Sequence, residues 1–115
     1  SVYDSNMATT EWANQFHELT LLEGSRKAIL SRISTGYEGN QNPDLLRDLE
    51  IPALIIHGKE DNIIPVSSSE KLVTFFQNGK LIIYDEVGHL PMYEAPERTA
   101  QDIRKFFLTQ LRLSF

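Results

Sequence analysis

An aspartate and a histidine follow two consecutive apolar segments of this chain, and together they could perform acid–base chemistry. Asp61 comes after the apolar run 51–58, and His89 comes after the run 80–84. An aspartate that accepts the Nδ1 proton of a histidine fixes its tautomer, and that histidine can then act as a general base in hydrolysis. Because either residue could instead be an ordinary turn former, their spacing alone leaves both interpretations open.

The residues around this pair predict a strand–helix–strand unit. Segments 53–56 and 80–84 are continuous apolar runs, which is typical of parallel strands that are covered on both faces. Between them, residues 67–70 read Ser-Ser-Ser-Glu, a capping box that predicts a helix start at the serines. Open α/β sheets place their ligands at the carboxyl ends of parallel strands. We therefore expect Asp61 and His89 to lie within hydrogen-bonding reach of each other.

The first third of the chain predicts helices and a loop. Apolar residues recur at helical spacing in residues 9–22, with a threonine cap at the start, and again in residues 26–34. The polar, glycine-containing stretch 36–43 predicts a loop or linker. We accordingly divide the chain into a helical segment with a linker, residues 1–43, and an α/β part, residues 44–115.

Composition excludes several classes of function. The 115-residue chain has a net charge of −5 from scattered residues and no basic stripe, which weighs against nucleic acid or an anionic membrane as a partner. It has no cysteine, and its three histidines are dispersed without clustered carboxylates, so we expect no metal and no cofactor. No apolar run approaches the roughly 18 residues of a membrane span. With no signal-peptide pattern at the start, we expect a cytoplasmic protein.

Two longer motifs give the pair a family context. Residues 49–65, LEIPALIIHGKEDNIIP, resemble the strand that carries the catalytic acid in the α/β-hydrolase superfamily, and residues 87–97, VGHLPMYEAPE, resemble its histidine loop. The resemblance covers roughly residues 44–111 and is closest to ester, thioester and carbon–carbon-bond hydrolases with a helical lid. It implies that Asp61 is the acid and His89 the base of a triad. It also implies that the helices near the N-terminus are lid-end or post-lid elements.

The chain departs from this family in one large respect. It contains no Gly-x-Ser-x-Gly elbow, and no counterpart of the strands and oxyanion loop that precede the elbow. Its serines do not lie between paired glycines on a strand-to-helix turn (Ser25, Ser31, Ser34 and Ser67 to Ser69 are the hydroxyls considered). We interpret the chain as the C-terminal half of an α/β-hydrolase fold, inactive alone. Once completed by a segment that carries a serine or an aspartate nucleophile, it would hydrolyse an ester-like, carbon–carbon or amide bond of a small-molecule substrate.

An alternative is a non-catalytic half-hydrolase module that works through self-association or partner binding. Under either interpretation, two parallel strands without sheet neighbours leave an unpaired edge and uncovered apolar faces. We therefore expect a homodimer or a complementing chain that completes the sheet. The two other histidines are assigned no catalytic role: His57 belongs to the strand end, and His17 lies within a helix.

Overall fold

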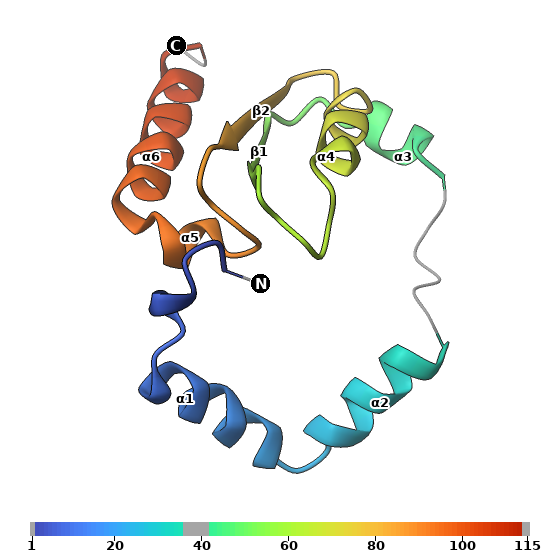
Figure 1. The fold of residues 1–115 in the computed structure, drawn as a ribbon. Helices are drawn as coiled ribbons and strands as arrows, with labels where there is room; N and C mark the ends of the chain where they lie inside the picture. The colour runs from blue at the N-terminus through green and yellow to red at the C-terminus, as the bar shows by residue number, and fades with distance from the viewer. Residues whose placement is uncertain (1, 36–41, 114–115) are drawn as a thin grey trace. The chain divides into compact units, whose positions relative to one another are not determined.

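The computed structural model describes residues 2–35 and 42–113 of the chain. Its internal contacts divide it into two units, one of residues 6–42 and the other of residues 1–5 together with 43–115. The second unit contains the α/β part (Figure 1). The predicted loop falls largely on residues outside the described ranges, and the assignment of residues 1–43 to a lid segment stays a prediction.

The α/β unit is built on a parallel two-stranded sheet. Strand β1, Ala53–Gly58, pairs with strand β2, Gly79–Tyr84, in a register that places Gly58 opposite Tyr84. Both strands therefore end at the same edge of the sheet. The strands are parallel, and a helix connects the end of one to the start of the other, as parallel pairing requires. This arrangement confirms the α/β fold class that the sequence predicted.

Helices lie on both faces of this sheet. Helix α4, Val66–Val73, forms the crossover and packs on both strands. Helix α5, Pro91–Glu94, and the long helix α6, Pro96–Leu113, contact β1 and lie on the side of the sheet opposite α4 (Figure 1). The result is a layer of helix, a layer of strands and a second layer of helix, which is how parallel sheets bury both faces.

The start of α4 differs from the prediction. The helix begins at Val66 with Pro65 as its N-cap residue, and no serine side chain caps it, so the predicted capping box is wrong. The backbone of Ser68 bonds to the carbonyl of Pro65 at 2.9 Å, which places the serines inside the first turns. The physical reason is tertiary: Ser69 is buried, and its hydroxyl is bound to a side chain of β1 instead of the helix end.

The best-buried side chain of the α/β unit is Tyr84, at the end of β2. Its ring is 0% exposed, its hydroxyl lies 2.5 Å from an Oδ atom of Asp102, and the guanidinium of Arg98 lies 3.9 Å from the ring centre. Burial, together with the hydrogen bond to Asp102, raises the pKa of Tyr84 above its ordinary value. These contacts fix α6 to the strand from which the histidine loop departs.

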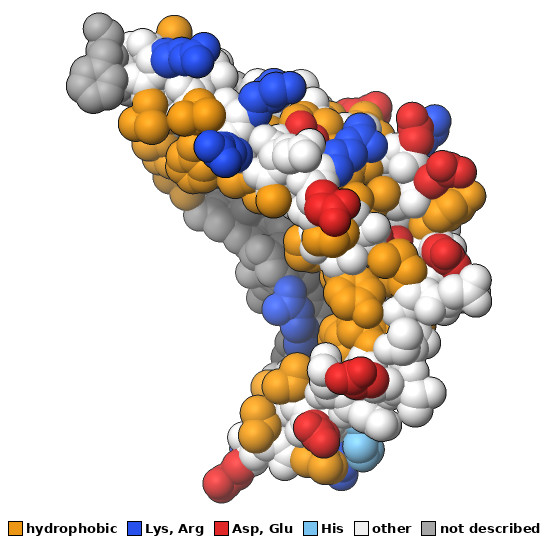
Figure 2. Space-filling model, turned by 90° about the vertical axis from the view of Figure 1, so that its left-hand side faces the viewer, with side chains coloured by type: hydrophobic (Ala, Val, Ile, Leu, Met, Phe, Trp, Pro, Cys, Tyr) orange, Lys and Arg blue, Asp and Glu red, His pale blue; other side chains and the backbone are white. Residues whose placement is uncertain are grey.

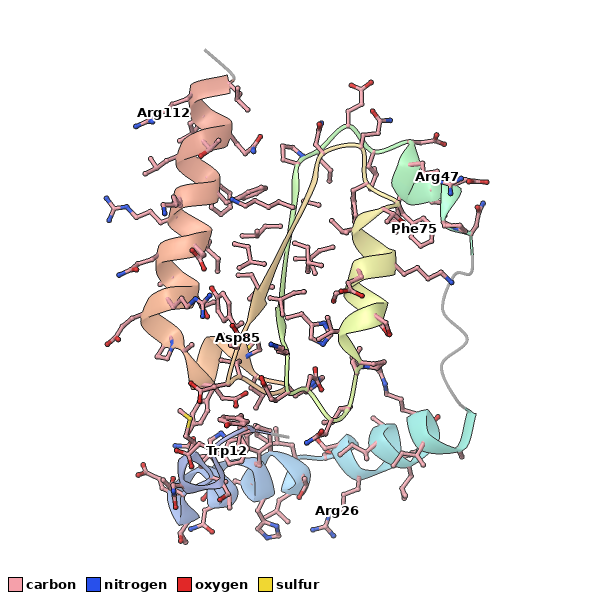
Figure 3. The ribbon with its side chains drawn as sticks, turned by 45° about the horizontal axis from the view of Figure 1, so that its top comes forward. Trp12, Arg26, Arg47, Phe75, Asp85 and Arg112 are labelled. Atoms are coloured by element: carbon pink, nitrogen blue, oxygen red, sulfur yellow. The ribbon has the colours of Figure 1, made fainter. Side chains whose placement is uncertain are left out.

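A second contact fixes the connection into β1. The short helix α3, Asp44–Arg47, ends at Arg47. The guanidinium of this residue lies 5.6 Å from the ring centre of Phe75, which follows α4 (Figure 3). Gln77 donates its side-chain amide to the carbonyl of Arg47, and Asn78 donates to that of Glu50. The chain therefore enters β1 alongside the turn that leads into β2.

The other unit is a pair of helices. Helix α1, Thr10–Leu21, has Thr9 as its N-cap residue, whose hydroxyl accepts the N–H of Trp12 at 3.1 Å, as the sequence predicted. Helix α2 follows as Ser25–Thr35, and a single 3₁₀ turn, Ser5–Met7, precedes both. Exposed apolar side chains are frequent on these helices, as Leu30 at 66% and Ile33 at 74% illustrate.

The α/β unit also exposes apolar side chains. On α6, Phe107 is 61% and Leu111 is 54% exposed, although the apolar residues of this helix recur at helical spacing. Figure 2 shows hydrophobic side chains gathered near the C-terminal end of the chain. Within the described residues, β1 pairs only with β2, so its second edge carries no strand partner.

No helix in the described ranges combines the length and apolarity needed to cross a membrane.

Candidate active site

Asp61 and His89 meet at the carboxyl edge of the sheet. The Oδ2 atom of Asp61 lies 2.9 Å from the Nδ1 atom of His89, so the expected contact is present. Because a carboxylate oxygen only accepts, Nδ1 carries the proton and the Nε2 lone pair of neutral His89 is left to act as a base. The side chain of Asp61 is 4% exposed and that of His89 is 31% exposed, so a buried acid supports an accessible imidazole.

The other oxygen of Asp61 is held by the backbone. Its Oδ1 atom accepts the N–H groups of Ile63 and Ile64 at 2.8 and 2.9 Å. Burial alone would raise the pKa of Asp61, but these two bonds together with the bond from His89 outweigh it, and the pKa is lowered from its ordinary value. The carboxylate therefore stays ionised at neutral pH, as a group that must stabilise an imidazolium has to be.

A second imidazole lies against the same carboxylate. The Nε2 atom of His57 is 3.3 Å from Asp61 Oδ2 and 2.9 Å from the carbonyl oxygen of Ile64, and its Nδ1 atom is 2.5 Å from Ser69 Oγ. Both acceptors face Nε2, so this nitrogen carries the proton, and the Ser69 hydroxyl donates to Nδ1. His57 and Ser69 are each 7% exposed. No local pattern in the sequence predicted this buried link from α4 to the acid.

The two loops approach each other closely at Gly58. A Cβ atom at this position would collide with the backbone carbonyls of Gly88 and Val87. The backbone of Glu60 also donates to the carbonyl of Val87 at 3.0 Å, and that of Lys59 to Tyr84 at 2.9 Å. Only a residue without a side chain fits between β1 and the histidine loop, and this packing brings Asp61 and His89 into contact.

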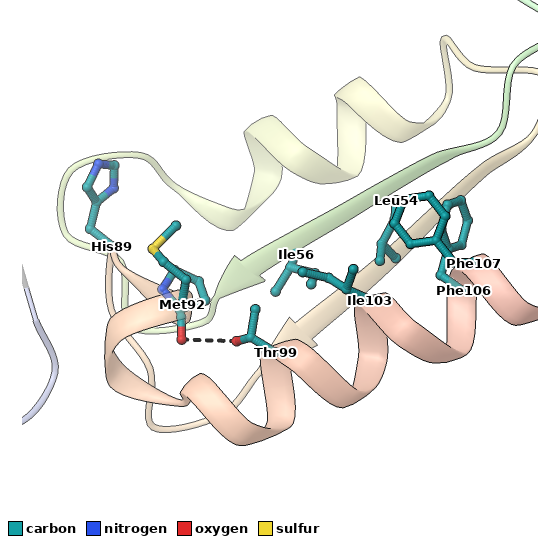
Figure 4. Close-up of a pocket in the computed structure, with 9 residues that line it drawn as sticks. Leu54, Ile56, His89, Met92, Thr99, Ile103, Phe106 and Phe107 are labelled. Atoms are coloured by element: carbon teal, nitrogen blue, oxygen red, sulfur yellow. Dashed lines mark hydrogen bonds between the residues drawn. The ribbon is translucent and has the colours of Figure 1, made fainter.

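His89 lies at the end of an apolar groove. The groove has a volume of about 500 Å³ and runs between β1 and α6; His89 and Met92 lie at one end, and Leu54, Phe106 and Phe107 at the other (Figure 4). A smaller pocket of about 260 Å³ lies on the α4 side and is also lined by His89, together with Asp61 and Ser68. The imidazole is therefore reached from both faces of the sheet.

The described residues do not assemble a nucleophile beside His89 in the manner of a strand-to-helix elbow. The serine that does reach an imidazole is Ser69, which is buried and bound to His57. No group of three or more potential metal ligands occurs within the described ranges. The arrangement places an ionised carboxylate against an oriented imidazole, a pair whose chemistry is suited to general-base catalysis.

Comparison with known proteins places this geometry in a family. Residues 6–96 match the model of the alpha/beta hydrolase fold, and the chain therefore belongs to that family. The chain is 34% identical over 102 residues to the bifunctional esterase/perhydrolase of Acinetobacter calcoaceticus, an alignment that covers 83% of this chain and 36% of the relative. It thus spans roughly a third or less of the length of the curated relatives it matches.

Solved structures agree with this assignment. A variant of the meta-cleavage product hydrolase from Pseudomonas fluorescens superposes with a TM-score of 0.77 at 27% identity, over 94% of this chain and 42% of that one. A serine hydrolase involved in carbazole degradation superposes with a TM-score of 0.65 at 26% identity, over 77% of this chain and 36% of that one. The strands and helices described above are thus a partial α/β hydrolase fold, as the sequence motifs predicted.

Proposed function

We propose that Asp61 and His89 are the acid and base of a hydrolase that cleaves ester-like bonds, and that the nucleophile belongs to a segment outside the 115 residues. The observation that carries this proposal is the 2.9 Å contact between Asp61 Oδ2 and His89 Nδ1, made by a buried carboxylate and a partly exposed imidazole. A salt bridge that served stability alone would not need an accessible imidazole with a free Nε2 atom.

The chemistry follows from this arrangement. Nε2 of His89 removes the proton of a nucleophilic hydroxyl as it attacks the substrate carbonyl, and the resulting imidazolium is stabilised by Asp61. His89 then returns the proton to the leaving group, and a water molecule, activated in the same way, releases the acyl product. One of the solved structures that this chain resembles is described as a serine hydrolase, which supports a serine hydroxyl as the nucleophile.

The substrate class rests on the relatives. One is an esterase/perhydrolase and another a meta-cleavage product hydrolase, so we propose that an ester or an activated carbon–carbon bond is hydrolysed. Both reactions place a carbonyl carbon under nucleophilic attack and need the same acid and base. A carboxylic acid is the product in each case.

We further propose that the chain alone is inactive and is completed by a strand–helix segment, in the same polypeptide or in a second copy or chain. The unpaired edge of β1 and the groove lined by Leu54, Ile56 and Phe106 support this, because an open sheet edge and an open apolar face are surfaces against which a further strand and helix can pack. The completing segment would also bring the N–H donors that bind the oxyanion.

Hydrolysis of p-nitrophenyl acetate and butyrate tests this proposal. We expect the 115-residue chain and its His89→Ala variant to hydrolyse both esters at equal, near-background rates. Saturable turnover by the chain that is lost in the variant would show that a nucleophile lies within these residues, contrary to the proposal. Light scattering on the same sample checks the assembly, since a stable compact monomer would contradict completion by a second copy.

A further inference from the structure

The carboxylate of Glu94 lies beneath the loop that carries His89. Its Oε1 atom accepts the backbone N–H of Gly88 at 3.0 Å, and its Oε2 atom accepts that of Leu90, also at 3.0 Å. The N–H groups of the residue before His89 and of the residue after it are therefore bound to the two oxygens of one side chain. Neither N–H group belongs to a strand or to the hydrogen-bonded part of a helix, so each needs a partner of this kind.

Helix α5 holds Glu94 in this position. The backbone N–H groups of Tyr93 and Glu94 both bond to the carbonyl of Leu90 at 2.9 Å, so one turn of helix closes directly after His89. Glu94 thus binds Leu90 twice: its own N–H donates to the carbonyl of Leu90, and its carboxylate accepts the N–H of Leu90, which is the N-cap residue of α5. The N–H of Tyr3 adds a third bond, to Oε1 at 2.5 Å, which ties the start of the chain to the same carboxylate.

The alternative role is helix capping without any effect on the base. Capping alone requires only the bond to Leu90, because Leu90 is the N-cap residue of α5. The bond to Gly88 lies on the other side of His89 and does nothing for the helix. With both bonds in place, the backbone is held at the residue before His89 and at the residue after it. Asp61 holds the imidazole at the end of the side chain. Catalytic groups must be held within about 0.5 Å of their productive geometry, and a loop bound on both sides of His89 meets that requirement.

We propose that Glu94 is a positioning residue that holds the histidine loop so that His89 Nδ1 stays bound to Asp61. This inference rests on the proposed function, since it assigns Glu94 to the base of that mechanism. A glutamine at position 94 has the same shape but only one accepting atom, so its amide would place an N–H₂ group against the N–H of Gly88 or Leu90. The loop would lose one of its two bonds without losing packing volume.

The hydrogen bond itself can be observed by NMR on the intact chain. The His89 Nδ1–H proton should give a signal that exchanges slowly with solvent and that disappears in Asp61→Asn through loss of the carboxylate. In Glu94→Gln we expect the exchange of this proton and of the Gly88 and Leu90 amides to accelerate about tenfold or more. Glu97→Gln, an exposed change in the first turn of α6, is the matched control and should leave all three unchanged.

The outcomes separate the two claims. Exchange in Glu94→Gln at the wild-type rate, in a sample whose circular dichroism shows native folding, overturns the role of Glu94 and leaves the acid–base pair intact. Absence of an Asp61-dependent His89 signal in the wild type overturns the proposed function itself. Should Glu94→Gln not fold, Glu94→Asp carries the test, because it keeps both acceptors on a shorter arm: accelerated exchange supports the proposal and a wild-type rate opposes it.

Discussion

The Nδ1 atom of His57 lies 2.5 Å from the hydroxyl oxygen of Ser69, so this imidazole is anchored to helix α4. His57 has partners on both ring nitrogens and is 7% exposed, whereas the side chain of His89 is 31% exposed. Both imidazoles contact the same oxygen of Asp61. This difference in burial supports the proposal that His57 holds the acid in place and that His89 acts as the base.

Ser69→Ala tests this support. The change leaves the buried Nδ1 atom of His57 without its donor, which should lower the free energy of unfolding by about 1–3 kcal/mol. Ser68→Ala is the matched control: Ser68 is the adjacent, exposed residue of the same helix, and its replacement should change stability by less than about 0.5 kcal/mol. Urea unfolding of both variants measures the difference. Equal stability of the two variants would show that the hydrogen bond between Ser69 and His57 makes no net contribution to the free energy of unfolding.

The lowered pKa of Asp61 makes stability depend on pH in the acid range. Its backbone and His89 bonds favour the ionised form in the folded state, so the stability they contribute is complete above the unfolded pKa of about 3.9 and is lost as the pH falls through the lower folded value. The gap in unfolding free energy between wild type and Asp61→Asn should therefore shrink as the pH falls below about pH 4.

Asp85→Asn is the control for that comparison. The pKa of Asp85 is also lowered, by its bond to Lys59, but both side chains are largely exposed, so the pair should contribute little to stability. Unfolding curves of the three proteins at several pH values provide the measurement. A gap for Asp61→Asn that widens in acid would mean that burial, and not its hydrogen bonds, dominates the pKa of this carboxyl.

Gly58→Ala should separate the acid from the base. The added Cβ atom meets two rigid backbone carbonyls, of Val87 and Gly88, so the histidine loop must move away from β1. We expect a loss of about 3 kcal/mol in unfolding free energy, at the upper end of the range for overpacking. The slowly exchanging His89 Nδ1–H signal should be lost as well. A folded variant that keeps this signal would mean that the loop can shift without opening the pair.

Much of this architecture follows from local sequence. The two apolar runs predicted β1 and β2, and the ends of those runs located Asp61 and His89, because strand direction and side-chain chemistry are both visible in a short window. The threonine cap at the start of α1 was an equally local feature. The apolar residues of α6 recur at helical spacing, yet Phe107 and Leu111 are exposed, because this spacing does not reveal what packs against the helix.

The remainder of the site depends on contacts between distant residues. Ser69 looked like part of a helix cap, but a buried imidazole competes for its hydroxyl, and no pattern within one helix reports that competition. Helix α5 is only four residues long, too short for any periodicity, so the position of Glu94 under the histidine loop was not predicted. The histidine-loop motif contained this glutamate, but nothing in the motif indicated that its carboxylate binds two backbone N–H groups of the loop.

The central claim is that His89, held by Asp61, is the base of a hydrolase whose nucleophile lies outside these residues. The most direct measurement is kcat/KM for p-nitrophenyl butyrate with the product of the complete reading frame, compared between wild type and His89→Gln. We predict saturable turnover by the wild type and a loss of about 10³-fold or more in the variant, since removal of one triad member leaves only oxyanion binding and substrate binding. A His89→Gln enzyme that retains activity within a few-fold of wild type would contradict the account.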